Sequence, residues 1–297
     1  MSRDAFGGFH PAVNFLYFVL VIGFSMFFMH PVSLALSLIC ALTYAVCLNG
    51  RRAVRLGLWF LLPMVVFTAA LNPLFNHAGA TILAYLPNGN PLTLESALFG
   101  LAAAVMLVTV IAWFSCFNAV MTSDKLVYLF GRVIPALSLT LAMALRFVPR
   151  FRAQIKIISN AQKGIRRDVT SGNILQKARH GMKILSILVT WALENAIETA
   201  DSMKGRGYGL PGRTAFSIFR FDRRDAWAVA YILTCAAIVI VGAVTGAYQF
   251  RYFPTMRGQW GGVGTIVVFG AHLALAALPL IVTVKEEFIW RRIASKT

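Results

Sequence analysis

The chain alternates long apolar runs with short polar breaks. The apolar runs are Val13–Met29, Val32–Leu48, Leu56–Leu71, Leu94–Asn118, Ala226–Tyr248 and Gly262–Val284. A helix that crosses a bilayer needs about 20 mostly apolar residues, with a lower limit of about 17. The pattern therefore predicts an all-α polytopic membrane protein with about six transmembrane helices.

Histidine–proline pairs precede the first two apolar runs. They are His10-Pro11 and His30-Pro31. Proline is tolerated in the first turn of a helix, where its missing N–H costs nothing. Each pair therefore predicts a helix start, with the histidine as a cap at the membrane interface and not as a metal ligand.

The polar breaks between the first spans are expected to be loops. Asn49–Arg55 predicts a short basic loop, and Asn72–Thr93, rich in proline, glycine and asparagine, predicts a longer polar one. Pro63 predicts a kink in the third span, because proline removes a helical hydrogen bond.

Composition supports the membrane interpretation. Apolar residues make up 58% of the chain and charged residues only 13%, whereas soluble domains are about 45–50% apolar. The net charge is +17, from 28 basic and 11 acidic residues. In a membrane protein such an excess is typical of cytoplasmic segments, so we do not expect nucleic-acid binding.

The distribution of lysine and arginine predicts the orientation. Residues 119–225 hold 18 of the 28 basic residues, and only Arg251 and Arg257 fall on the opposite side. Without the long segment the count is still eight to two, so the positive-inside rule places both termini in the cytoplasm. We expect a multi-pass cell-membrane protein with a four-span region at 1–118, a cytoplasmic region at 119–225 and a two-span region at 226–297.

The cytoplasmic region is predicted to contain two long helices. The first follows Pro135, and Pro149 leaves open whether Pro135–Ile165 is one helix or two. The second is Gln176–Lys204, broken or bent near Gly181. Apolar residues recur along the first at helical spacing: Leu137, Leu141, Leu145, Val148, Ile155 and Ile158. One interpretation is an amphipathic helix on the membrane surface, held by anionic lipid.

The second helix ends in a glycine-rich stretch. Glu194, Glu198 and Asp201 share one helical stripe, and Gly205 or Gly207 is placed to take the left-handed conformation that closes a helix. Arg206 then lies at the helix end with small neighbours. The simplest alternative is a helix cap with a solvated arginine.

The stretch Trp191–Thr214 resembles the second coupling helix of the transmembrane T component of energy-coupling factor (ECF) transporters, the EcfT/CbiQ-like family. Glu198–Met203, Arg206–Gly209 and Gly212–Thr214 match the family pattern E-T-A-D-S-M, R-G-Y-G and G-R-T. The match covers about twenty contiguous residues, and the hydrophobic layout of the remaining chain fits the family.

The resemblance implies a scaffold and coupling subunit of an ECF-type ABC importer for vitamins or transition-metal ions. Its implied partners are two cytoplasmic ABC ATPases, a membrane-embedded substrate-binding S component and the lipid bilayer. The residues implied to couple to the ATPases are Arg206, Gly205, Gly207, Arg166 and Gly164. At the first helix end we assign Arg166, although Gly164-Ile165 departs from the family's form and leaves Arg167 as the alternative. The residues implied to contact the S component are Leu137, Leu141, Leu145 and Val148.

No pattern for catalysis, cofactor or metal binding is found. The chain has no G-x-x-x-x-G-K-[ST], no G-x-S-x-G and no H-E-x-x-H, so we expect neither an enzyme nor a bound cofactor. Within the spans only Glu95 and His272 are ionisable, and we expect His272 to form a hydrogen bond between helices. Two alternatives remain open: an ion-coupled secondary transporter or other polytopic protein with its own substrate path, and a membrane-surface anchoring protein. The transported substrate is not readable from this chain.

Overall fold

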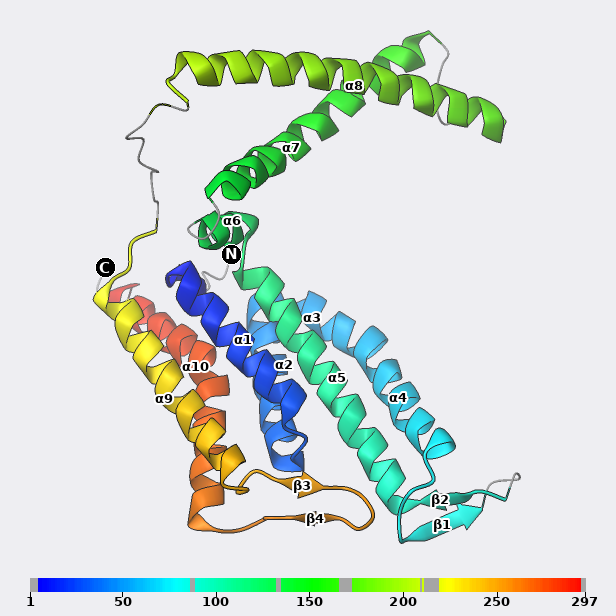
Figure 1. Cartoon of the computed structure of the whole chain (residues 1–297), viewed down its shortest axis with the longest axis vertical. Helices are drawn as coiled ribbons and strands as arrows, with labels where there is room; N and C mark the ends of the chain where they lie inside the picture. The colour runs from blue at the N-terminus through cyan, green and yellow to red at the C-terminus, as the bar shows by residue number, and fades with distance from the viewer. Residues whose placement is uncertain are drawn as a thin grey trace. The chain divides into compact units, whose positions relative to one another are not determined.

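A computed structural model of the chain describes residues 5–85, 89–131, 135–165, 173–208, 210 and 219–294. The chain divides into two compact units, residues 1–125 with 219–297, and residues 126–218 (Figure 1). Almost all of the regular structure in the described residues is helical. The predicted all-α class is thereby confirmed.

The first unit contains the apolar helices and two small β-hairpins. Its elements are η1 Phe6–Gly8, α1 Pro11–Phe27, α2 Pro31–Asn49, α3 Arg51–Leu56, η2 Gly57–Leu61, α4 Leu62–Phe75, β1 Ile82–Tyr85, β2 Pro91–Thr93, α5 Leu94–Val120, α9 Arg223–Val244, β3 Phe250–Arg251, β4 Arg257–Gly258 and α10 Val263–Ala294. Five described segments are long and apolar enough to cross a membrane: Pro31–Asn49, Ala53–Phe75, Leu94–Val120, Arg223–Val244 and Val263–Ile289. The apolar helix α1 is shorter, at 17 residues. The chain is therefore a multi-pass membrane protein, and the count of about six spans stays a prediction.

The second unit consists mainly of two long helices. They are α7, Pro135–Gly164, and α8, Ile174–Gly205, while the short helix α6, Ser123–Gly131, lies across the boundary between the units. Pro149 lies inside α7, so the first predicted segment is one helix and not two. The helix α8 continues without a break past Gly181. It begins at a capping box, in which the Asn173 N–H donates to Gln176 Oε1 at 3.3 Å.

The two histidine–proline pairs cap helices as expected. The Nδ1 atoms of His10 and His30 accept hydrogen bonds from the N–H groups of Ala12 and Val32, each at 3.2 Å. An accepting Nδ1 requires a neutral ring. For His30 this agrees with burial, which lowers the pKa of the imidazole.

A polar network holds the core of the first unit together. The Trp113 indole N–H donates to Ser37 Oγ at 2.9 Å, and the Ser37 and Ser25 hydroxyls lie 2.8 Å apart. The Tyr17 hydroxyl donates to the carbonyl oxygen of Ala276 at 3.1 Å. All four side chains are buried. These bonds join α1, α2, α5 and α10 without leaving polar atoms exposed to lipid.

One end of this unit is fixed by basic side chains. Lys125 Nζ donates to the carbonyl oxygen of Gly7 at 2.7 Å. Arg224 forms an ion pair with Glu286 at 3.3 Å and lies over the Phe9 ring at 4.0 Å. These contacts hold the η1 segment against the start of α9 and the end of α10. In Figure 1 the two hairpins lie at the opposite end of this unit.

The predicted basic loop at Asn49–Arg55 is wrong, because most of it is helical. Gly50, with φ of +54°, is the only break between α2 and α3, which begins at Arg51. A glycine can take this conformation without steric cost, so one residue is enough to turn the chain. A π-helical turn, Gly57–Leu61, precedes α4, and Pro63 lies in the first turn of that helix.

The predicted polar loop at Asn72–Thr93 is also more ordered than expected. Its first residues continue α4 to Phe75, and β1 and β2 pair as an antiparallel hairpin. The Glu95 carboxylate, only 2% exposed, accepts hydrogen bonds from the Thr81 N–H at 3.2 Å and the Thr81 hydroxyl at 2.9 Å. Glu95 therefore holds the hairpin against the first turn of α5.

The helices α9 and α10 approach closely at Gly242. A Cβ atom placed there would lie 2.2 Å from Val268 Cγ2, so only a residue without a side chain fits. Gly246 has a different role, because its φ of +80° places it in the turn that follows α9. Only the first glycine of Gly242-x-x-x-Gly246 therefore contributes to helix packing.

We expect Gly242→Ala to lower the thermal stability of the purified protein. Inserting a methyl group into a packed contact typically costs about 1–3 kcal/mol, which outweighs the ~1 kcal/mol that alanine gains over glycine in a helix. Gly270→Ala in α10 is the matched control, because nothing lies within 4 Å of its Cβ position. Melting curves in detergent that were equal for Gly242→Ala and the wild type would contradict the close approach.

Candidate functional site

The helices α7 and α8 cross each other through a small aromatic contact. Phe151 and Trp191 meet edge to face with ring centroids 5.8 Å apart, and Arg150 lies over the Trp191 ring at 5.6 Å. Among the described residues of these two helices, Ile158 and Ile184 are the only buried apolar side chains. The pair therefore has almost no core of its own.

The apolar stripe of α7 is largely uncovered. Leu141, Leu145 and Val148 are 40%, 36% and 45% exposed. Leu137 lies within the bounds of α7, but its side chain is outside the described set. Helix α8 also exposes apolar side chains, with Leu193 and Ile197 more than 60% exposed. Such extended apolar surface marks a binding site or a membrane contact.

A Schellman motif closes the C-terminal end of α8. The Tyr208 N–H donates to the carbonyl oxygen of Met203 at 3.0 Å, and the Gly207 N–H donates to that of Lys204 at 2.9 Å. Gly207 has φ of +78°, the left-handed conformation that this motif requires. Of the two glycines left open by the sequence, Gly207 takes this role, and Gly205 is the last residue of the helix.

Arg206 is the capping residue between these two glycines. Its backbone is at φ −88° and ψ 9°, and its side chain is exposed. Its backbone N–H donates to the carbonyl oxygens of Ser202 and Met203, whereas its guanidinium forms no hydrogen bond or ion pair with any part of the chain that the structure describes. The motif therefore sets the backbone direction at Arg206 while its planar set of donors stays available.

The end of α7 is less completely described. Gly164 is its last residue, and the Ile165 N–H donates to the carbonyl oxygen of Gln162 at 3.3 Å. Nothing lies within 4 Å of a Cβ at Gly164. Arg166, assigned above as the coupling residue, and its alternative Arg167 lie outside the described residues.

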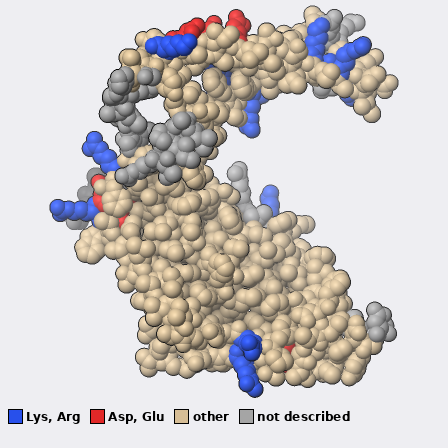
Figure 2. Space-filling model, viewed as in Figure 1, with Lys and Arg blue, Asp and Glu red and all other residues tan. Residues whose placement is uncertain are grey.

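The acidic stripe of α8 is exposed. Glu194, Glu198 and Asp201 lie on its surface and form part of the acidic patch on this helix in Figure 2. The structure gives them no ion pair with any described residue of α7. Among the three, only Asp201 lies close to the last turn of α8, where the macrodipole disfavours a carboxylate.

His272, the candidate within the sixth apolar run, does not form the expected hydrogen bond. It is 2% exposed, and neither ring nitrogen has a partner among the described residues. No group of three or more described His, Cys, Asp or Glu side chains could hold a metal ion. The four cysteines are free, with Cys47 exposed and the other three buried.

Comparison with known proteins places this architecture in a family. The family model described as CbiQ, cobalt transport protein, matches residues 9–216. The chain belongs to the CbiQ family. This confirms the resemblance seen in Trp191–Thr214, and the CbiQ family match covers α7 and α8.

Named relatives of this CbiQ-family chain are transmembrane proteins EcfT of energy-coupling factor transporters. The chain is 29% identical to that of Lactobacillus helveticus over 36% of its own length and 39% of the relative. For Lacticaseibacillus paracasei the identity is 35%, over 36% and 41%. For Staphylococcus aureus it is 24%, over 68% and 82%. The first two alignments thus span about two-fifths of the relatives.

We expect Gly207→Ala to loosen the end of α8, whereas Gly205→Ala leaves it intact. Alanine in the left-handed conformation costs about 1–2 kcal/mol, and a Cβ at Gly207 would also lie 3.1 Å from Leu210 Cδ1. At Gly205 the backbone is helical, with nothing within 4 Å. Hydrogen exchange of the Tyr208 and Gly207 amides measures the difference. Equal protection in both variants would contradict the assignment of the motif.

Proposed function

We propose that this protein is the T component of an ECF-type ABC importer, the subunit that transmits ATPase movement to a substrate-binding S component during vitamin or transition-metal uptake. Its place in the CbiQ family and its EcfT relatives support this proposal. The observation that carries it is the end of α8, where a Schellman motif presents the Arg206 side chain with no ion-pair partner among the described residues. A solvated cap alone does not explain the acidic stripe and exposed apolar residues of the same helix.

Two ATPase subunits are the proposed cytoplasmic partners. The C-terminal ends of α7 and α8 lie on opposite sides of the helix crossing in Figure 1, so each end can serve one ATPase. Arg206 binds carboxylates in a groove of one subunit, because guanidinium matches carboxylate geometry with two parallel hydrogen bonds. Gly164 and Arg166 serve the other end. ATP hydrolysis belongs to these partners, since the chain has no Walker A pattern.

The proposed S-component surface is the apolar stripe of α7. The residues proposed to contact the S component are Leu137, Leu141, Leu145 and Val148. The last three, whose side chains are described, are partly exposed to solvent. Full burial of a leucine or valine side chain is worth about 1.5–3 kcal/mol, so covering the 36–45% of these side chains that is still exposed supplies roughly 1 kcal/mol each. Closure of the ATPases then displaces the helix ends, and the rigid helices, about 45 Å long at 1.5 Å per residue, tilt the S component.

The proposed topology places both termini and residues 119–225 in the cytoplasm. The lysine and arginine distribution supports it. Within the first unit, the start of the described chain and the end of α10 lie at the same end, as an even number of spans requires. The division into regions 1–118, 119–225 and 226–297 belongs to this proposal.

We expect Arg206→Ala to abolish or strongly reduce ATP-driven uptake. Truncating a buried, hydrogen-bonded charge at an interface typically costs ~2–5 kcal/mol, at least a tenfold loss of ATPase affinity. Arg206→Lys should restore uptake only in part, because an ammonium group lacks the planar set of donors. Uptake in vesicles and co-purification of the ATPases are the measurements.

Lys204→Ala is the matched control for Arg206. It removes the same charge from the last turn of α8 and lies two residues away on another face. We expect it to leave uptake close to wild type. Wild-type uptake by Arg206→Ala with ATPases still bound would show that Arg206 is a solvated cap and that the coupling mechanism is wrong.

We expect Leu141→Glu to weaken S-component binding and to leave ATPase binding largely intact. A buried, unpaired carboxylate costs several kcal/mol, more than the contact supplies. Ile157→Glu is the control, because Ile157 is 60% exposed and lies about 160° around α7 from Leu141 at 100° per residue. Pull-down of both partners distinguishes the outcomes. Equal loss of S component and ATPases would instead indicate misfolding.

A further inference from the structure

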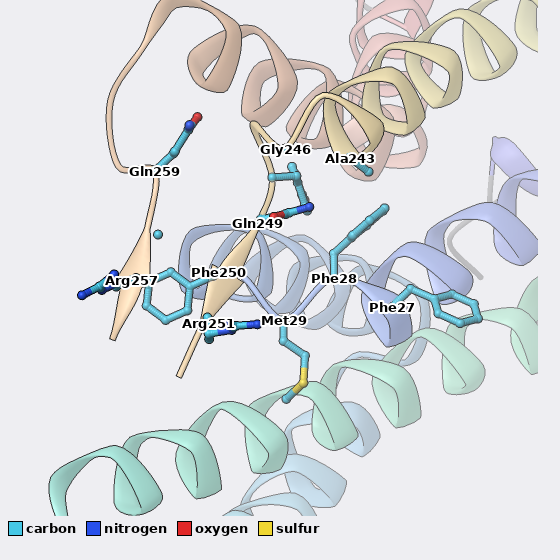
Figure 3. A pocket seen from close by; sticks show the side chains of 12 residues that line it. Phe27, Phe28, Met29, Ala243, Gly246, Gln249, Phe250, Arg251, Arg257 and Gln259 are labelled. Atoms are coloured by element: carbon cyan, nitrogen blue, oxygen red, sulfur yellow. The ribbon is translucent and has the colours of Figure 1, made fainter. Parts of the chain in front are cut away.

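A cavity lies under the β3–β4 hairpin of the first unit, at the end of α1 and α9. Its volume is about 860 Å³, and Figure 3 shows it in close-up. One part of its lining is apolar and includes Phe27, Phe28 and Ala243. The other part is polar and includes Arg251, Arg257, Gln249 and Gln259. The cavity thus has the two-part chemistry of an amphiphile.

The two arginines are direct partners across the hairpin. Arg251 and Arg257 are paired in the strand register, both are exposed, and neither forms an ion pair with a described residue. Like charges directly opposite each other destabilise a strand pair. In Figure 3 the Arg251 side chain extends toward Met29, whereas that of Arg257 extends to the other side of the hairpin.

These are also the two basic residues that the charge distribution assigns to the side opposite the cytoplasm. Basic residues are scarce in such loops, yet the chain places both on one hairpin, in register. The positive-inside rule therefore does not explain why both arginines lie on this hairpin.

The hairpin is held firmly in place. The Tyr252 hydroxyl donates to the carbonyl oxygen of Met29 at 2.9 Å. A Cβ at Gly258 would lie 2.1 Å from the Phe250 ring, so that ring packs directly on the opposite strand. The Phe250 ring also meets Trp260 edge to face at 5.5 Å. The backbone that carries the two arginines is therefore positioned before any ligand binds.

Neighbouring aromatic residues place the hairpin at the level of the lipid headgroups. Trp260 is 65% exposed and Phe27 is 83% exposed. Tryptophan gathers at the interface between membrane and water, while an exposed phenylalanine next to a span contacts acyl chains. If the acyl chain of a lipid lies along Phe27 and Ala243, the headgroup of that lipid lies beside the hairpin.

We propose that this cavity binds the headgroup of an anionic phospholipid. Arg251, whose side chain extends toward Met29 in the lining, holds the phosphate, Arg257 adds positive charge from the other side of the hairpin, and the amides of Gln249 and Gln259 contact the remaining polar atoms. Guanidinium groups bind phosphate oxygens with paired, charge-assisted hydrogen bonds. A bound phosphate also offsets part of the positive charge that the two strand-paired arginines bring to this end of the unit. The cavity is formed by residues of the first unit only. Lipid binding there does not depend on the role proposed for α7 and α8.

The test uses the full-length protein in nanodiscs of phosphatidylcholine with a photoactivatable lipid as probe. The probe is phosphatidylglycerol or phosphatidylcholine carrying a diazirine in its acyl chain, and mass spectrometry maps the labelled peptides. We expect phosphatidylglycerol to label the segments 27–29 and 243–259 in clear preference to phosphatidylcholine. R251Q/R257Q should lower the ratio of phosphatidylglycerol to phosphatidylcholine labelling. The expected decrease is about fivefold for each arginine removed, because a basic residue near an anionic lipid surface contributes about 1 kcal/mol.

Two variants and one competitor make the result decisive. R251K/R257K should retain most of the preference, and R51Q/R55Q, which removes the same charge elsewhere in the unit, should leave it unchanged. Equal labelling by the two lipids, or an unchanged preference in R251Q/R257Q, would overturn the proposal. Inorganic phosphate in millimolar excess should not displace the lipid. If it did, the cavity would bind a free anion, and the assignment to lipid would be wrong.

Discussion

The membrane unit depends on one constraint, the need to satisfy every polar group without water. In hydrocarbon an unpaired polar group costs several kcal/mol. The chain of bonds from Trp113 through Ser37 to Ser25, together with the bond from Tyr17 to Ala276, meets this requirement for four buried side chains, whereas His272 does not meet it among the described residues. Because each bond joins two different helices, the same atoms also select the neighbours of α1. Substituting Ser37 would leave the buried Trp113 indole N–H without its partner.

The second unit, unlike the first, has almost no buried core. Two helices of 30 and 32 residues cross with only Ile158 and Ile184 buried among their described apolar side chains. Helices that bury so little of each other obtain little stability from packing. Their apolar, acidic and basic groups remain exposed, in the pattern expected of a surface that other subunits complete. Because the contact is sparse, a change in the crossing angle of α7 and α8 breaks few interactions. The proposed transmission of ATPase movement requires such a change.

Some charged side chains have a partner within the described chain, and others have none. Arg224 has both Glu286 and the Phe9 ring, and Glu95 has Thr81. Arg206, at the end of α8, and the pair Arg251 and Arg257, on the β3–β4 hairpin, have no ion-pair partner among the described residues. An unpartnered arginine on a rigid support is the common feature of the two proposals. The expected ligands differ: a protein carboxylate for Arg206, and a lipid phosphate for the hairpin.

Elements whose signal is local could be predicted from the amino-acid sequence. Apolar runs of sufficient length indicated the spans, His10 and His30 indicated helix starts, and Gly205-Arg206-Gly207 indicated a helix end, because each depends on neighbouring residues only. The family resemblance likewise rested on contiguous residues. Tertiary structure decided what depends on distant residues. It selected Gly207 over Gly205, kept α7 continuous through Pro149, and left His272 without the expected hydrogen bond. It also placed Arg251 and Arg257 in the lining of the same cavity as Phe27, a residue more than 200 positions away, and no local pattern contains that arrangement.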